Sequence, residues 1–323
     1  MLDTNKPTIL VSKCIEGEAC RYDGSMIKDS FIKRLKSYVN VIYVCPEVAI
    51  GLPTPRDSLR LIEKEKVVKL VCSKTREDLT NSMIKFSDKF LENIDEYKVQ
   101  GVILKGRSPS CGIKDAKLYN DIWKSSTISR NNNGIFAQKV IEKFNNIPIE
   151  SEGRLTNYNI REQFLTSIYA NFNFIKVEET RTLEELIKFH NEYKYLLMAH
   201  SPTRQRELEK IIKLAKVDNL NLIIDEYKNI FSKALANASR PMRNINMLLH
   251  LFSYFSKDIT KEEKAFFLDN LENYQNKKVP FSLPLTIIKS WAIRFNNTYL
   301  LNQKIFESFP MELVDVTDSG KGI

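Results

Sequence analysis

A change in character near residue 155 limits most strongly what this chain can fold into. No glycine occurs between Arg154 and Ser319, and apolar residues recur at helical spacing over the same segment. The spans with this spacing are Arg161–Phe174, Leu183–Met198, Arg204–Lys216, Leu222–Leu235, Asn244–Phe255, Thr260–Tyr274 and Leu285–Phe306. The pattern predicts an all-α C-terminal domain over residues 156–323, ending in a frayed tail from Val314.

The first 155 residues alternate between two kinds of pattern. Short apolar, β-branched runs predict strands, and longer segments with helical periodicity lie between them. The expected strands are Thr8–Val11, Val41–Val44, Lys66–Val71, Gly101–Lys105 and Ile147–Ile149, and the expected helices are Ile27–Val39, Thr75–Ile94 and Gly134–Phe144. Alternating strands and helices predict an α/β domain built on a doubly wound parallel sheet, over residues 1–155.

Composition narrows the class of protein. The 43% of hydrophobic residues is typical of a folded globular chain, and no apolar run is long enough for a transmembrane helix. The N-terminus lacks the apolar core of a signal peptide, so we expect a cytoplasmic protein without a membrane partner. The formal net charge of +9 permits a polyanionic partner such as RNA without requiring one.

The cysteines are confined to the first third of the sequence, at positions 14, 20, 45, 72 and 111. An odd number of cysteines in a cytoplasmic chain argues against a disulfide framework. Cys14, Cys45 and Cys111 each follow a different predicted strand, within loops rich in glycine, proline or serine. Strands of a parallel sheet end at a shared edge, so these three thiols can meet there and hold a soft metal or an iron–sulfur cluster. The alternative is that they are small buried residues without a ligand.

The loop from Cys45 to Arg56 contains three prolines and one glycine. Because proline lacks the backbone N–H that helices and sheets use for hydrogen bonds, we expect a stiff loop that is neither helix nor strand. It holds Cys45, Glu47 and Arg56 close to one another at a strand end. Glu47 is a candidate for proton transfer, and the alternative is an ion pair with Arg56.

Three motifs in the N-terminal domain occur in a recognisable order. They are Val-Ser-x-Cys with Arg-Tyr-Asp-Gly, then Cys-Pro-Glu with Gly-Leu-Pro-Thr-Pro-Arg, then Leu-Lys-x-Arg-Ser-Pro-Ser-Cys-Gly. The pattern resembles the TudS-type thiouracil desulfidases over residues 8–155. The resemblance implies a [4Fe–4S] cluster held by Cys14, Cys45 and Cys111, with one iron open to substrate.

The same resemblance implies a hydrolytic removal of sulfur from a thiolated base. Such a reaction needs a group that moves a proton from water, and Glu47 is our candidate. Ser108, beside the third motif's cysteine, is the second candidate catalytic residue. As a turn residue, Ser108 has the alternative role of shaping its loop.

Two segments of the C-terminal half combine aromatic and basic residues, Phe189–Ser201 and Arg240–Lys257. Such residues can stack on unpaired bases and contact phosphates, and the alternative is an ordinary helical core with cations at its edge. The pattern resembles the helical, YbgA-like domain of two-domain RudS-type desulfidases, which implies binding of tRNA that contains 4-thiouridine. From charge alone, the expected RNA contacts are Lys194, Arg204, Arg243 and Lys257.

Together the two resemblances imply a tRNA 4-thiouridine desulfidase, and they imply no obligate protein partner. Two alternatives remain. One is a desulfidase of free thiouracil or thionucleosides, and the other is a non-enzymatic iron–sulfur protein that binds RNA or acts in redox. The non-enzymatic alternative needs a fourth protein ligand, for which Cys20 and Cys72 are the candidates.

Overall fold

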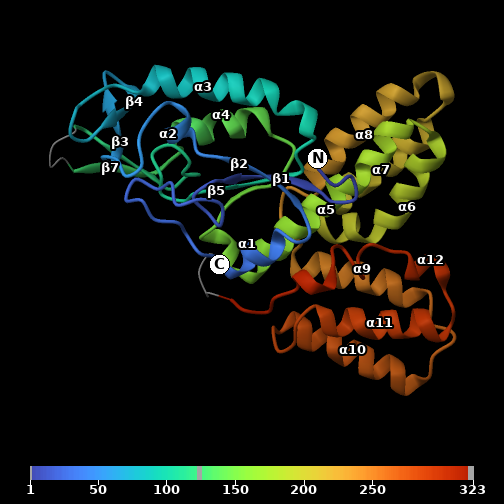
Figure 1. Ribbon diagram of the computed structural model, residues 1–323. Coiled ribbons are helices and arrows are strands. Elements are labelled where there is room, and N and C mark those ends of the chain that lie inside the picture. Colours follow the sequence, from blue (N-terminus) through green and yellow to red (C-terminus); the bar gives the residue numbers. More distant parts are fainter. Residues whose placement is uncertain (1, 122–125, 319–323) are drawn as a thin grey trace. The chain divides into compact units, whose positions relative to one another are not determined.

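The computed structural model describes residues 2–121 and 126–318, and these form two compact units. One unit comprises residues 1–168 together with 313–323, and the other comprises residues 169–312. The long helix α5, Tyr158–Thr180, runs through the point of division. Figure 1 labels the elements of both units.

A four-stranded parallel sheet forms the centre of the first unit. Its strands are β1 Thr8–Ser12, β2 Asn40–Val44, β5 Gly101–Leu104 and β8 Ile149–Ser151, in the order β2-β1-β5-β8. All three pairings are parallel, and β1 and β5 are completely buried. Figure 1 shows α3 and α4 on one side of this sheet and α1 on the other. The predicted α/β class with a parallel sheet is therefore confirmed.

A second, mixed sheet of the same unit contains strands that the sequence pattern did not reveal. Its strands are β3 Leu59–Lys64, β4 Val67–Cys72, β6 Ala116–Tyr119 and β7 Thr127–Asn132, in the order β4-β3-β6-β7. The expected strand at Lys66–Val71 is β4, which pairs antiparallel with β3 in this sheet and is not part of the parallel one. The hairpin turn at Glu65 and Lys66 has positive φ at both residues without a glycine, so it carried no sequence signal.

The helices of the first unit are shorter than their periodicity predicted. They are α1 Ser30–Leu35, α2 Pro46–Ala49, α3 Thr80–Asn93 and α4 Ile135–Lys143. The expectation of no helix in the Cys45–Arg56 loop was wrong, because α2 forms one turn there with Pro46 at its first position. α3 begins later than expected, because the segment before it returns along β4, where Leu79 N donates to Leu70 O.

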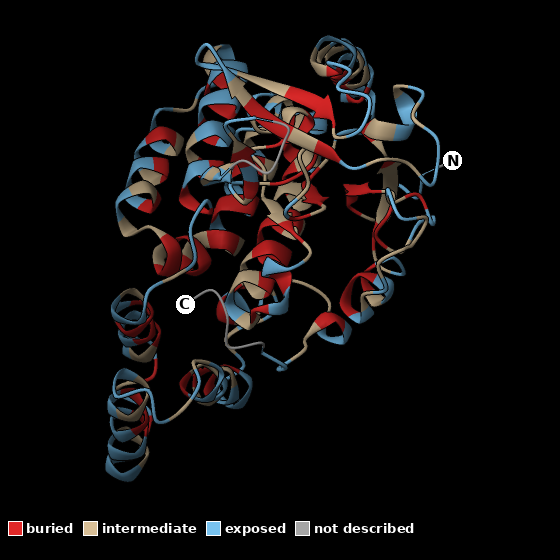
Figure 2. Cartoon of the chain, turned by 90° about the vertical axis from the view of Figure 1, so that its left-hand side faces the viewer, coloured by how far each residue is buried: buried red, intermediate tan, exposed pale blue. Residues whose placement is uncertain are grey.

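The second unit is entirely helical over its described residues, as predicted. After α5 come α6 Leu183–His200, α7 Pro202–Leu214, α8 Leu220–Ala234, α9 Pro241–Ser253, α10 Lys261–Gln275, α11 Ser282–Arg294 and α12 Thr298–Leu301, with short 3-10 turns at Val217–Asn219 and Met311–Leu313. Figure 2 shows buried residues on one side of these helices and exposed residues on the other. Stacked and edge-on rings of Phe174, Phe189, Tyr227 and Phe231 form much of the core.

Two C-terminal expectations need correction. The helix expected over Leu285–Phe306 is two helices, because Asn296 has a φ of 50° and the Asn297 side chain caps α12. The tail was expected to fray from Val314, but residues 314–318 belong to the first unit. There Asp315 pairs with Arg34 at 2.7 Å and its carbonyl accepts from the buried Arg161. Residues 319–323 lie outside the described residues.

Within the described part of the chain, no helix combines the length and the apolar character that crossing a membrane requires.

Candidate active site

Three cysteine loops meet the carboxyl edge of the parallel sheet. Cys14 follows β1 by two residues, Cys45 follows β2 directly, and Cys111 lies in the loop after β5. β1 pairs with both β2 and β5, so these three strands are neighbours that end at the same edge. The chain passes from β1 to β2 and then returns to β5 on the other side of β1. In open α/β sheets, ligands bind where the strand order reverses in this way.

The thiols at this edge affect one another; Cys14 and Cys111 are buried and Cys45 is half-buried. Burial, followed by the charge of Cys45, raises the pKa of the Cys14 thiol to about 12. Burial, followed by the charges of Cys14 and Glu47, raises the pKa of the Cys111 thiol well above its usual range. All five cysteines are free thiols. Nearby positive charge would favour the deprotonated form of these thiols.

The Cys111 loop is shaped by Ser108. The Ser108 Oγ accepts from the backbone N–H groups of Ser110 and Cys111, both at 3.1 Å, and the Gly112 N–H donates to the Ser108 carbonyl at 2.8 Å. These bonds form a tight turn that fixes the backbone of Cys111. Ser108 thus lies at the expected edge, where its oxygen has a structural task, while its hydroxyl hydrogen is not used by these bonds.

The first turn of α4 packs against the same loop. Ile135 N donates to Pro109 O at 3.1 Å, and Ala137 N donates to Ser110 O at 3.0 Å. The N-terminal amides of α4 are thus satisfied by loop carbonyls. Gly134 permits this approach, because a Cβ there would lie only 2.4 Å from the carbonyl oxygen of Ser110.

Glu47 occupies a small polar network beside the cysteines. Its Oε1 accepts from the Ser110 hydroxyl at 2.9 Å, and its Oε2 receives the Arg56 guanidinium through Nε at 2.8 Å and Nη2 at 2.7 Å. Only 13% of the Glu47 side chain and 5% of the Arg56 side chain are exposed. Arg56 also donates from Nη1 to the carbonyl of Cys20 at 3.0 Å. The ion pair between Glu47 and Arg56, which the sequence offered as the alternative role of Glu47, is therefore present. The Glu47 carboxylate is also held against Ser110, the residue that precedes Cys111.

A second ion pair at this edge was missed by the sequence reasoning. Lys105 Nζ pairs with Glu152 Oε1 at 2.6 Å, and Gly106 N donates to Glu152 Oε2 at 2.7 Å. The Lys105 ammonium opposes the rise in the Cys14 pKa, so it lies within reach of that thiol. The backbone N–H of Lys105 donates to Ser12 Oγ at 2.9 Å. Lys105 directly follows β5 and Glu152 directly follows β8. These positions after parallel strands could have indicated that both residues lie at the same sheet edge.

The two remaining cysteines lie in different environments. Burial, followed by the charge of Cys45, raises the pKa of the Cys20 thiol to about 12, so Cys20 lies beside Cys45. The Cys45 thiol is 4.0 Å from the carbonyl of Cys20. Cys72 instead ends β4 in the mixed sheet and lines a hollow of about 480 Å³ that also contacts Arg56. Of the two candidates for a fourth ligand, only Cys20 lies at the cysteine edge.

Comparison with known proteins assigns this part of the chain. Residues 9–152 match the family model described as 2-thiouracil desulfurase. Over 126 residues, 38% of this chain and 82% of the relative, the chain is 32% identical to the uncharacterized protein YbbK of Bacillus subtilis (strain 168). The chain belongs to the 2-thiouracil desulfurase family.

Further likenesses cover other parts of this desulfurase-family chain. Residues 194–310 match the model of a protein of unknown function (DUF1722). The chain is 25% identical over 144 residues, 44% of its length, to the uncharacterized protein YbgA of Escherichia coli (strain K12), of which it covers 85%. A solved structure titled [4Fe-4S]-dependent thiouracil desulfidase TudS shares 27% identity, covering 46% of this chain and 93% of that one, with a TM-score of 0.38.

The helical unit of the desulfurase-family chain places its four expected RNA contacts in different settings. Lys194 lies 3.4 Å from the Glu209 carboxylate. Arg243 donates to the carbonyl of His200, so part of its hydrogen-bonding capacity is used within the fold. Arg204 is half-buried and Lys257 is exposed. Among these four residues, Lys194 lines a groove formed by α6, α7 and α9, and the other three do not.

Proposed function

We propose that this protein is a [4Fe–4S]-dependent desulfidase that removes the sulfur of 4-thiouridine in tRNA by hydrolysis. Membership of the 2-thiouracil desulfurase family supports the reaction class. One structural observation carries the proposal. Three cysteine loops follow three adjacent parallel strands, and the partly buried Glu47 is hydrogen-bonded to the residue that precedes Cys111.

The donor set fits an iron–sulfur cluster. Cys14, Cys45 and Cys111 are free thiols, and the backbone of the Cys111 loop is held by Ser108 and not by the cysteine sulfur. Soft thiolate donors select iron–sulfur clusters among metal groups. Within residues 2–121 and 126–318, no group of three or more His, Cys, Asp or Glu side chains lies close enough together to hold a single metal ion. A cluster does not require that arrangement, because each thiolate binds a different iron atom.

When bound, the cluster would supply a Lewis-acidic iron to the thiocarbonyl sulfur. The chain's own residues then handle protons and position. Glu47 accepts a proton from the water that attacks carbon 4 of the base, and Arg56 and Ser110 hold its carboxylate in place. The balance is thiocarbonyl plus water to carbonyl plus hydrogen sulfide, with no net oxidation. Ser108 has its hydroxyl hydrogen left for the substrate ring after accepting two backbone bonds.

The tRNA part of the proposal depends on the helical unit and on charge. The chain carries a net charge of +9, which permits a polyanionic partner. A 4-thiouridine within folded tRNA is stacked, and unstacking it costs about a few kcal/mol. Phosphate contacts from a second domain would offset this cost, which gives the helical unit a physical role.

A second candidate function is desulfuration of free 2-thiouracil, which the description of the matched family favours. Comparing substrates on the full-length protein separates the two. We expect kcat/KM for tRNA bearing 4-thiouridine to exceed that for free 2-thiouracil and for the 4-thiouridine nucleoside. The loss of thiocarbonyl absorbance and the release of sulfide measure both reactions under anaerobic conditions. Equal or higher efficiency on free 2-thiouracil would contradict the tRNA proposal and support the second candidate.

A further inference from the structure

A groove on the helical unit joins the two segments that combine aromatic and basic residues. It lies between α6, α7 and α9 and has a volume of about 850 Å³. Segment Phe189–Ser201 supplies Lys194 and Tyr195, and segment Arg240–Lys257 supplies His250 and Tyr254. Residues far apart in the sequence are therefore brought to one concave surface, within the size range of small-ligand sites.

The aromatic part of this groove is exposed and held in a defined orientation. Tyr254 has 43% of its surface exposed, whereas Tyr195 is buried. The Tyr195 hydroxyl donates to the Tyr254 hydroxyl at 3.0 Å, with the two rings at 80°. Tyr299 also contacts Tyr254, with 6.2 Å between the two ring centroids. A ring fixed in this way presents a π-face at little entropic cost, as stacking on a base requires.

Basic side chains line the same groove as this ring. Lys194, Arg206 and His250 line the groove, and Arg206 and His250 are exposed. Glu209 is the acidic group of the lining, and it lies 3.4 Å from Lys194 Nζ. Basic side chains and an exposed aromatic ring in one groove are a combination that binds single-stranded nucleic acid, because phosphates meet the basic groups while the base stacks.

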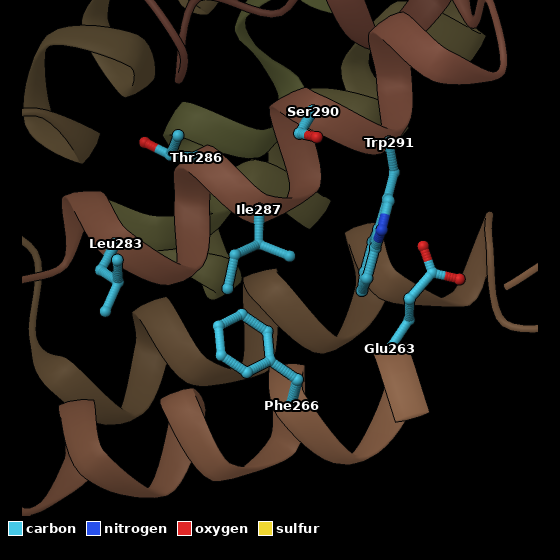
Figure 3. Close-up of a pocket in the computed structure, with 7 residues that line it drawn as sticks. All are labelled: Glu263, Phe266, Leu283, Thr286, Ile287, Ser290 and Trp291. Carbon is cyan, nitrogen blue, oxygen red and sulfur yellow. The ribbon is translucent and has the colours of Figure 1, made fainter. Parts of the chain in front are cut away.

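A second groove on the same unit has an exposed aromatic residue but a different set of charged lining residues. The groove between α10 and α11 has a volume of about 300 Å³, and Figure 3 shows Phe266 and Ile287 facing one another across it. Phe266 is 59% exposed, but the only charged lining residue is Glu263. Its lining contains an aromatic surface but no basic residue, so it lacks the combination found in the α6–α7–α9 groove.

We propose that the α6–α7–α9 groove binds an unpaired nucleotide of the RNA substrate, with its base against Tyr254 and its phosphate near Arg206 and His250. The inference rests on the proposed tRNA substrate and adds the place and manner of contact. A nucleotide held here would anchor the RNA independently of the base that reacts at the cysteine edge.

Binding of unmodified tRNA to full-length protein tests the inference without depending on catalysis. The dissociation constant is measured by fluorescence anisotropy for wild type, Tyr254→Leu, Tyr254→Phe and Arg206→Glu. We expect Tyr254→Leu to weaken binding roughly tenfold, because a stacking contact is lost. Tyr254→Phe should stay within about twofold of wild type, since the ring remains. Arg206→Glu should weaken binding and lower the dependence of affinity on salt.

Matched controls come from the other groove and its helix. Phe266→Leu removes an exposed aromatic ring, and Lys261→Glu changes an exposed cation of α10 by the same charge as Arg206→Glu. We expect both to bind tRNA within about twofold of wild type. Melting temperatures confirm that each variant is folded.

Two results would overturn the inference. One is equal affinity of wild type, Tyr254→Leu and Arg206→Glu for tRNA, and the other is an equal loss in the control variants. Tight tRNA binding by a wild type that releases no sulfide from 4-thiouridine tRNA would instead contradict the proposed function and leave the groove as the binding site.

Discussion

Replacing Gly134 by alanine should disturb the cysteine edge without removing any polar group. A Cβ at this position would lie 2.4 Å from both the carbonyl carbon and the oxygen of Ser110 and 2.8 Å from the amide nitrogen of Cys111. Ordinary van der Waals contact begins near 3.4 Å, so the two backbones must separate by about 1 Å. Neither side is a flexible side chain that can move away.

The magnitude follows from the atoms that must shift. Inserting a methyl group against rigid backbone costs roughly 1–3 kcal/mol of folding free energy. The displaced segment carries Cys111 and the Ser110 hydroxyl that binds Glu47, and it is held by the first turn of α4. Gly134→Ala should therefore lower both thermal stability and the iron bound per chain after anaerobic reconstitution.

Gly153→Ala is the matched control. No atom lies within 4 Å of a Cβ built there, and the residue has φ −66° and ψ −31°, which alanine adopts without strain. Its stability should stay equal or rise by roughly 0.4–1 kcal/mol, with iron content unchanged. If Gly134→Ala bound as much iron as Gly153→Ala and melted at the same temperature, the close packing of α4 on the Cys111 loop would not position the ligand.

Three further predictions concern proton transfer and pH. Glu47→Gln should lower sulfide release by at least roughly 100-fold while iron per chain stays at the wild-type value, and an active variant would exclude Glu47 as the proton acceptor. Ser110→Ala removes a buried hydroxyl donor to Glu47, so stability should fall by roughly 1–3 kcal/mol and turnover should fall with iron retained; unchanged turnover would mean that Arg56 alone positions the carboxylate. Burial lowers the pKa of His190 to about 4. Because the unfolded state then binds the proton first, urea unfolding should show stability falling by about 3 kcal/mol from pH 6.5 to pH 4, with a smaller fall in His190→Gln.

The sequence predicted the parallel sheet and the helical unit because their patterns are long and regular. The strands β1, β2 and β5 are short apolar runs, and most C-terminal helices have boundaries within a few residues of their periodic segments. The mixed sheet was not predicted, because its strands are defined by how they pair and not by a regular sequence pattern. The β3–β4 hairpin turns through Glu65 and Lys66, both at positive φ, where glycine or asparagine would have marked the turn.

The sequence predicted that the three cysteine loops share one sheet edge, but it did not predict the polar contacts between those loops. Parallel strands made the shared edge of Cys14, Cys45 and Cys111 predictable, because strand ends coincide when pairing is parallel. Sequence distance hid the contacts of Glu47 with Ser110 and of Lys105 with Glu152, which join different loops. The roles of Glu47 and Ser108 in catalysis stay predictions.

The iron content of a matched set of cysteine variants tests the central claim most directly. Wild type and Cys14→Ser, Cys45→Ser, Cys111→Ser and Cys72→Ser are reconstituted anaerobically, and iron and acid-labile sulfide are counted per chain. We expect about four irons in wild type and in Cys72→Ser, whose thiol lies in the mixed sheet, and a large loss in the other three. Equal iron in all five proteins, or a loss that follows Cys72, would contradict a cluster at the edge of the parallel sheet.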